Sequence, residues 1–199
     1  ARNLAVQAQA IGAKLIHLST DDVFSHHARQ PYNEFEIPTP STIYGKSKLA
    51  GERFVQNLCT RHVIVRSSWV YGIGKDFVNT ILEAANNPSV TSMEVAENEF
   101  ASPTSATELA KVIEQLIDND CLGIYHAVCG GFCSRFEFAQ AILKAIHAKD
   151  KLTLKPISDS ETINYSVLDN MMLRLENFTQ PISWQQALKD YIRTTGGNN

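Results

Sequence analysis

Several features that would assign a chain to a particular class of protein are missing from these 199 residues. There is no run of 18 apolar residues, so the sequence predicts no transmembrane helix. An excess of one charge is also missing, because 18 basic and 21 acidic residues leave a formal net charge of −3. Such a balance gives no electrostatic reason to bind nucleic acid or an anionic membrane. We therefore expect a cytoplasmic protein that binds neither.

Cysteine is scarce and shows no disulfide or metal-binding pattern. The four residues, Cys59, Cys121, Cys129 and Cys133, contain no Cys-x-x-Cys pair. Because the chain is too long for a small secreted scaffold, we expect reduced thiols. A zinc site built from Cys129, Cys133 and a histidine is the alternative. We favour the absence of a metal site.

A glycine-rich turn of the kind that opens a dinucleotide-binding α/β domain is missing as well. That turn lets the backbone approach a pyrophosphate at a helix N-terminus. Gly72-x-Gly74 lacks the third glycine and does not have the required spacing to a following helix. Gly130-Gly131 is a turn before a helix that opens with a capping box. The first residues have the pattern of the inside of a helix. We therefore expect the later part of a longer enzyme, and a fold that has lost its loop is the alternative.

What the sequence does contain is an alternation of strand and helix patterns. This alternation predicts βα units and a mainly parallel sheet. Ser41, Ser105, Ser134 and Ser183 are the expected N-caps, with reciprocal capping boxes predicted at Ser105 and Ser134. The expected strands are 14–19, 62–67, 90–95, 123–128 and 151–157. The expected helices are 4–11, 41–58, 75–86, 105–118, 134–147 and 183–196.

Tyr44 and Lys48 are the first candidate functional residues. They are four apart on a predicted helix, so they share a face with Cβ atoms about 5–6 Å apart. The ammonium charge favours phenolate, so we expect the pKa of Tyr44 to fall from about 10 toward neutrality. A phenol with such a pKa can protonate an oxyanion as a general acid. The same spacing alone is also common on solvated helix faces.

Thr20 strengthens this interpretation. It follows a short apolar run, and small hydroxyl residues after such a run are typical of a buried parallel strand that ends at a binding site. The Thr20 hydroxyl could then bond the substrate oxygen that Tyr44 protonates. We expect Thr20, Tyr44 and Lys48 to form one catalytic set.

Ordered motifs along nearly the whole chain carry a resemblance to a known family. They are Leu18-Ser19-Thr20-Asp21-Asp22-Val23-Phe24, Pro31-Tyr32-Asn33-Glu34, Tyr44-Gly45-Lys46-Ser47-Lys48-Leu49-Ala50-Gly51-Glu52, Val65-Arg66-Ser67-Ser68-Trp69-Val70-Tyr71-Gly72, Ala101-Ser102-Pro103-Thr104-Ser105-Ala106, Gly123-Ile124-Tyr125-His126 and Ser166-Val167-Leu168-Asp169-Asn170. In these motifs the chain resembles the extended short-chain dehydrogenase/reductases, and among them most of all the dTDP-4-dehydrorhamnose reductase family.

The resemblance implies an activity and a site. NAD(P)H, with NADPH favoured over NADH, would reduce the 4-keto group of a nucleotide-linked 6-deoxyhexose to give dTDP-L-rhamnose. Thr20, Tyr44 and Lys48 match the family's catalytic residues, and Ser19, Tyr44 and Lys48 match its cofactor-side residues. Trp69 matches a substrate-side aromatic residue, with core packing as its alternative role. A homodimer with Mg²⁺ at the interface is a further expectation, since some relatives have one.

The chain departs from the family pattern on the substrate side. Asp22 stands where the family usually has tyrosine, so we assign Asp22 to substrate binding and expect its charge to repel an anionic substrate. An Arg-Arg-Pro segment is replaced by Thr162-Ile163-Asn164-Tyr165, and a glycine by Ser25.

The resemblance also implies a fold class: α/β, with a Rossmann-like parallel sheet, helices on both faces and a small C-terminal substrate-binding α/β lobe. Residues 1–199 would be the later portion of one unit. The core would span approximately 1–90 and 104–128, and the lobe approximately 91–103 and 129–199. We expect this piece alone to be inactive, because it has no cradle for the cofactor pyrophosphate.

Two other functions stay open at this point. One is a different nucleotide-sugar reductase or epimerase of the same family. The other is a non-catalytic binding module similar to the regulatory subunit of methionine adenosyltransferase. The complete set of Thr20, Tyr44 and Lys48 favours an enzyme, whereas the missing glycine-rich loop favours the module.

Overall fold

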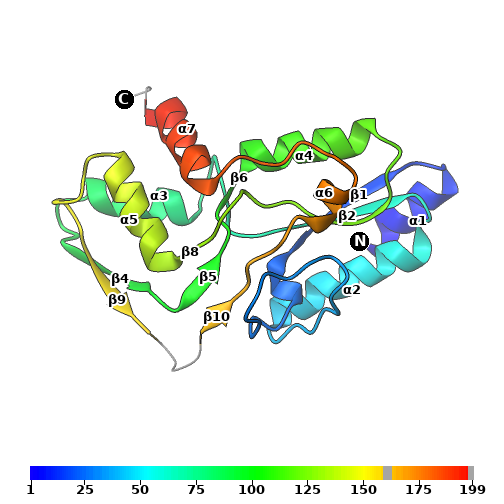
Figure 1. The fold of residues 1–199 in the computed structure, drawn as a ribbon, viewed down its shortest axis with the longest axis horizontal. Helices are drawn as coiled ribbons and strands as arrows, with labels where there is room; N and C mark the ends of the chain where they lie inside the picture. The colour runs from blue at the N-terminus through cyan, green and yellow to red at the C-terminus, as the bar shows by residue number, and fades with distance from the viewer. Residues whose placement is uncertain (159–162, 197–199) are drawn as a thin grey trace.

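A three-stranded parallel sheet forms the first of two cores in the computed structural model, which describes residues 1–158 and 163–196 (Figure 1). Its strand order is β1 (Leu15–Thr20), β2 (His62–Ser67), β7 (Gly123–His126). Leu15 pairs with His62, and Val63 pairs with Gly123. The structure confirms these three predicted strands, with ends that shift by at most two residues.

Helices cover both faces of this sheet. They are α1 (Arg2–Ala10), α2 (Ile43–Leu58) and α4 (Ala106–Asp118). In β2, Val63 and Val65 pack with α4, whereas Ile64 between them packs with α1 and α2. A parallel strand that is buried on both faces explains why this run is apolar at successive positions. The three layers are those of a Rossmann-like fold.

The helix ends agree with the sequence in most places. Gly12 ends α1 with a φ of +69°, a backbone conformation that suits glycine. Ser134 makes the full predicted capping box with Glu137 at the start of α5 (Arg135–Ala145). Two expectations were wrong in detail, one at the start of α2 and one at the start of α4.

The N-cap of α2 is Thr42 and not Ser41, because the Thr42 hydroxyl accepts a hydrogen bond from the Gly45 amide at 2.9 Å. At α4, Ser105 accepts from the Glu108 amide as predicted. The Glu108 carboxylate accepts instead from the side chain of Lys111 and the amide of Ile182, so the reciprocal half of that capping box is not made.

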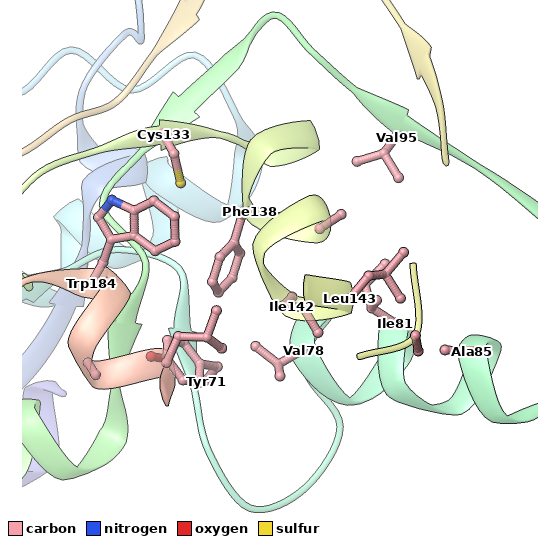
Figure 2. Packing of buried hydrophobic residues seen from close by; sticks show 14 of the residues in the cluster. Tyr71, Val78, Ile81, Ala85, Val95, Cys133, Phe138, Ile142, Leu143 and Trp184 are labelled. Atoms are coloured by element: carbon pink, nitrogen blue, oxygen red, sulfur yellow. The ribbon is translucent and has the colours of Figure 1, made fainter. Parts of the chain in front are cut away.

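The second core is built mainly from helix packing. It joins α5 to α3 (Phe77–Asn86), α7 (Trp184–Gly196) and the parallel pair β4 (Ser92–Ala96) and β9 (Thr153–Ile157). Figure 2 shows Phe138 and Ile142 of α5 among the side chains of Val78, Tyr71 and Trp184. The strands predicted near 90–95 and 151–157 are confirmed as β4 and β9.

A small mixed sheet lies between the two cores in Figure 1. Its order is β10 (Asn164–Tyr165), β5 (Glu99–Ala101), β8 (Cys133–Ser134), with β5 and β8 antiparallel. The other short elements are β3 (Val70–Tyr71), β6 (Thr104–Ser105), α6 (Met171–Leu175) and the 3-10 turn η1 (Asp21–Val23). Within the described ranges, no helix is both long enough and apolar enough to cross a membrane.

A buried ion pair fixes α2 to the sheet. Arg66 of β2 donates from Nε to Glu52 Oε1 at 2.9 Å and from Nη2 to Oε2 at 2.7 Å. Both side chains are 1% exposed. Because Glu52 lies one turn beyond Lys48, this pair also fixes the helix that carries Tyr44 and Lys48.

Candidate active site

The candidate site begins where β1 and β2 end. Thr20 is the last residue of β1, and Ser68 follows the last residue of β2. Ligands of open α/β sheets bind at the carboxyl ends of parallel strands, where neighbouring strands present side chains at one edge. Thr20 is only 8% exposed, so it lies in the interior at this edge of the sheet.

Asp21 collects hydrogen bonds from three separate segments at this edge. Ser68 Oγ donates to Asp21 Oδ2 at 2.6 Å, and Ser166 Oγ donates to the same oxygen at 2.7 Å. Thr20 Oγ1 lies 3.0 Å from the other oxygen, Oδ1. Burial raises the pKa of Asp21, and the serine hydrogen bonds counteract that rise in part.

The N-terminal turn of α2 lies against η1 because position 45 has no side chain. A Cβ atom on Gly45 would collide with the backbone carbonyl oxygen of Asp22. This close approach places Tyr44 where the charges of Asp22 and Asp21 act on its phenol. Tyr44 keeps 57% of its surface exposed, so it stays open to a ligand.

The expected direction of the Tyr44 pKa shift was wrong for this structure. The pKa of Tyr44 is raised, first by burial of the phenol and then by the negative charges of Asp22 and Asp21. Lys48 Nζ donates to the Leu18 carbonyl oxygen at 2.7 Å. The ammonium is therefore held at the strand, and burial of the phenol, the largest cause, raises the Tyr44 pKa whatever the charge of Asp21.

Asp22 is part of the site's hydrogen-bond geometry. Its amide donates to Thr20 Oγ1 at 3.2 Å, and its Oδ2 lies 3.4 Å from the same hydroxyl oxygen. Its Oδ1 lies 3.4 Å from His26 Nε2. Sequence reasoning gave His26 no role in the site.

Trp69 and Arg135 meet at the border between the two cores. The Arg135 guanidinium carbon lies 3.5 Å from the centroid of the Trp69 ring, and Glu99 Oε2 lies 3.7 Å from Arg135 Nε. Trp69 has a φ of +41° and also packs on Phe138 of the second core. Burial lowers the pKa of Arg135, and the charges of Glu99 and Asp21 counteract that shift.

Sequence reasoning missed Arg135. It is the first residue of α5. The sequence pattern at this place is the Ser134 capping box, which predicts where the helix begins but not what the Arg135 side chain contacts. Arg135 and Trp69 are 66 positions apart in the sequence, so no local pattern predicts their contact.

The residues expected on the cofactor side come from the end of β1 and the first turns of α2. The Ser19 hydroxyl oxygen is buried and has no hydrogen-bond partner in residues 1–158 and 163–196. Lys48 is bonded to the carbonyl just before Ser19, and Tyr44 lies one helical turn before Lys48. An unpartnered hydroxyl, a phenol and an ammonium are donors that fit the hydroxyl and amide groups of a nicotinamide nucleoside.

The described residues do not fit a metal ion. Nowhere in the two described ranges do three His, Cys, Asp or Glu side chains gather as a metal site. All four thiols are buried and free, and burial raises the pKa of Cys129 to about 11 and of Cys133 to about 12.

Comparisons with known proteins agree with this geometry. The family described as RmlD substrate binding domain matches residues 1–196. The spore coat polysaccharide biosynthesis protein SpsK of Bacillus subtilis is 35% identical over 196 residues, which cover 95% of this chain and 67% of that protein. The dTDP-4-dehydrorhamnose reductase of Escherichia coli is 32% identical over 202 residues, covering 94% and 67%. The chain thus spans about two thirds of the length of these curated relatives.

Solved structures give the same result. The dTDP-4-dehydrorhamnose reductase of Bacillus anthracis in complex with NADP superposes with a TM-score of 0.91 at 38% identity, covering 98% of this chain and 70% of that one. The Clostridium acetobutylicum counterpart gives a TM-score of 0.92 at 34% identity, with coverage of 98% and 70%. A dTDP-glucose 4,6-dehydratase shares the fold alone, with a TM-score of 0.82 at 15% identity and coverage of 98% and 66%.

Proposed function

Because the chain belongs to the RmlD substrate-binding domain family, we propose that it carries the proton-donating part of an NAD(P)H-dependent reductase. Its substrate is a nucleotide-linked 4-keto-6-deoxyhexose, and its product in the leading case is dTDP-L-rhamnose. The observation that carries this proposal is the arrangement of Thr20, Tyr44 and Lys48 around the carboxyl end of β1.

The chemistry that these residues support is reduction of a ketone. When bound, NAD(P)H supplies the hydride and is oxidised. The carbonyl π electrons move onto oxygen and form an alkoxide, which Thr20 and Tyr44 stabilise by hydrogen bonding. The Tyr44 proton passes to that oxygen and gives the hydroxyl. A raised pKa suits Tyr44 here, since it keeps the phenol protonated until the much more basic alkoxide forms.

The cofactor assignment extends the same geometry. Ser19, Tyr44 and Lys48 would hold the nicotinamide end of the cofactor, because their donors line one strand and one helix face. NADPH is favoured because a solved relative at 38% identity is a complex with NADP. The sequence offers no glycine-rich turn for the pyrophosphate, so we propose that this part of the cofactor is held outside these 199 residues.

The substrate side would be formed by Asp22, Trp69 and Arg135. The substrate-binding lobe would span approximately 91–103 and 129–199, and the core approximately 1–90 and 104–128, although α3 from the first of these core stretches packs against the lobe. The positive charge of Arg135 faces Asp21 across this border and can offset the acidic side chains for an anionic sugar nucleotide. We place the protein in the cytoplasm and propose a homodimer.

A second candidate is a reductase or epimerase that acts on a different sugar nucleotide. Asp22 favours it, because a carboxylate 3.4 Å from the Thr20 hydroxyl oxygen changes the charge beside the reacting group. A panel of 4-keto sugar nucleotides decides between the two candidates. A non-catalytic module would oxidise NADPH with none of them.

The test uses the whole protein that contains this chain, with dTDP-4-keto-6-deoxy-L-mannose and NADPH, and follows NADPH absorbance. Tyr44→Phe removes the proton donor, and we expect it to lower kcat by about 10²–10⁴-fold, the usual value of general acid catalysis. The matched control is Tyr71→Phe, whose buried hydroxyl has no partner in the described residues (Figure 2). An unchanged rate in Tyr44→Phe would show that another group donates the proton.

A further inference from the structure

The carboxyl group of Asp21 has no role in the chemistry described so far, yet it is the most heavily bonded side chain of the site. We propose that Asp21 is a positioning residue: as a neutral carboxylic acid it donates to Thr20, and thereby turns the Thr20 hydroxyl hydrogen toward the ligand. This inference rests on the proposed function, because it explains how Thr20 becomes a donor to the substrate oxygen.

The environment of Asp21 is unusual for an ionised carboxylate. The residue is 5% exposed. No Lys or Arg of the described residues forms an ion pair with it, although the charge of Arg135 reaches it. A buried charge without a contacting counter-ion is costly, so such a group tends to neutralise itself. Its three contacts are all hydroxyl groups, which can serve a neutral acid as well as a carboxylate.

The single hydrogen of the Thr20 hydroxyl distinguishes the ionised from the protonated state of Asp21. A threonine hydroxyl has one hydrogen and two lone pairs. The Asp22 amide donates to one lone pair, at 3.2 Å. If Asp21 is ionised, Thr20 must spend its only hydrogen on Asp21 Oδ1 at 3.0 Å. If Asp21 is protonated, Asp21 donates to the second lone pair and the Thr20 hydrogen becomes free.

The contacts also decide which oxygen carries the proton. Oδ2 already accepts from Ser68 and Ser166, so a proton there would displace one of those donors. Oδ1 has only Thr20 as a partner. The proton therefore sits on Oδ1, on the line to Thr20 Oγ1.

Other charged groups act on this pair. Burial is the largest influence on Asp21 and favours its neutral form, and the negative charge of Asp22 favours it further. His26, when protonated, and Arg135 favour the ionised form. Tyr44 also lies beside the pair and stays neutral, because burial of its phenol and the charge of Asp22 raise its pKa, and both influences persist when Asp21 is protonated.

The freed hydrogen has one competing acceptor among the described residues, Asp22 Oδ2 at 3.4 Å. This is a long contact, since hydroxyl-to-oxygen hydrogen bonds are usually about 2.7–2.8 Å. A substrate oxyanion at an ordinary distance would displace it. Thr20 thus faces the ligand as a donor only while Asp21 keeps its proton.

Two substitutions at Asp21 test the proposal in the whole protein. Asp21→Asn copies the neutral acid, because its amide group can donate to Thr20 while its carbonyl accepts from both serines. Asp21→Ala removes both functions. We expect Asp21→Ala to lower kcat at least tenfold and Asp21→Asn to recover most of that loss. Equal losses in the two variants would overturn the proposal, because they would mean that the ionised carboxylate is needed.

The pH profile distinguishes positioning from a merely structural role. In the wild type the active form is the protonated one, so kcat falls as pH rises through the Asp21 pKa. Asp21→Asn cannot lose this proton, and we expect that alkaline decline to disappear from its profile. A decline that persists unchanged in Asp21→Asn belongs to another group and contradicts the proposal.

A spectroscopic measurement makes the answer independent of turnover. Infrared spectra of the unliganded protein at pH 7 should contain a buried protonated carboxyl band that is absent from Asp21→Asn. Absence of any difference band would show that Asp21 is ionised and would overturn the inference. If the wild type reduces no 4-keto sugar nucleotide, the proposed function fails, while this band still decides the state of Asp21.

Discussion

The two cores of the molecule are held together by different kinds of contact. In the first, buried polar groups lie among the apolar layers: Arg66 and Glu52 form an ion pair with both side chains 1% exposed, and Asp21 gathers three hydroxyls. In the second, aromatic and aliphatic side chains surround Phe138, as Figure 2 shows. Directional contacts therefore concentrate in the core that holds the candidate catalytic set.

This difference has a physical meaning. Hydrogen bonds and ion pairs fix angles as well as distances, so a buried polar network holds its members in one arrangement. Apolar packing tolerates rearrangement as long as volume is conserved. The first core can hold reacting groups in a fixed geometry, while the second supplies a surface that can change shape without losing the fold.

The largest expected effect comes from breaking the polar contact of the first core. Glu52→Ala leaves the Arg66 guanidinium buried without its carboxylate, and we expect the free energy of unfolding to fall by about 3–5 kcal/mol. Urea denaturation measures it. The control is Glu52→Met with Arg66→Met, which removes both charges and should cost far less. A loss below about 1 kcal/mol for Glu52→Ala would contradict the comparison.

A smaller effect is expected from a conservative change in the second core. Phe138→Leu keeps an apolar side chain in contact with Tyr71 and Trp184, and we expect a loss below about 1.5 kcal/mol. Phe138→Ala creates a cavity and should cost about 3–5 kcal/mol. If the leucine variant lost as much free energy of unfolding as the alanine variant, ring geometry and not side-chain volume would stabilise this core. Directional contacts would then be important in both cores.

The smallest effect is expected at the border between the cores. Arg135→Gln removes the cation over the Trp69 ring, an interaction of about 0.5–2 kcal/mol. The variant also removes a positive charge beside an anionic substrate, so we expect KM for the sugar nucleotide to rise by about tenfold, the value of one hydrogen bond to a charged group, with little change in kcat. Steady-state kinetics on the whole protein measures both. Arg193→Gln on the exposed end of α7 is the matched control, and equal effects in the two variants would remove Arg135 from the substrate side.

Sequence reasoning found what local patterns encode. The main strands are short apolar runs, and the candidate catalytic set lies within the 29 positions from Thr20 to Lys48, so local patterns could predict both. The Asp21 cluster could not, since Ser68 and Ser166 are 47 and 145 positions away. The two-residue strands, such as β10, exist only because partners pair with them and carry no pattern of their own.

The error in the Tyr44 pKa has the same origin. Spacing on a helix showed Lys48 beside the phenol, but it could not show that Asp21 and Asp22 approach from the turn after β1. Nor could it show that the Leu18 carbonyl binds the lysine. Burial of the phenol, and after it the charges brought near by tertiary structure, outweigh the neighbour that the sequence made visible.

The absence of a side chain at position 45 allows α2 to lie against η1, so the site depends on glycine there. Any side chain there would meet the Asp22 carbonyl and force the first turn of α2 outward, while the Glu52 contact with Arg66 would keep the middle of the helix in place. The helix would then pivot about Glu52, and Tyr44, eight positions from the pivot by residue number, would travel farther than Lys48 at four. A side chain at position 45 would thus separate the Tyr44 phenol from Lys48 before it unfolded the domain.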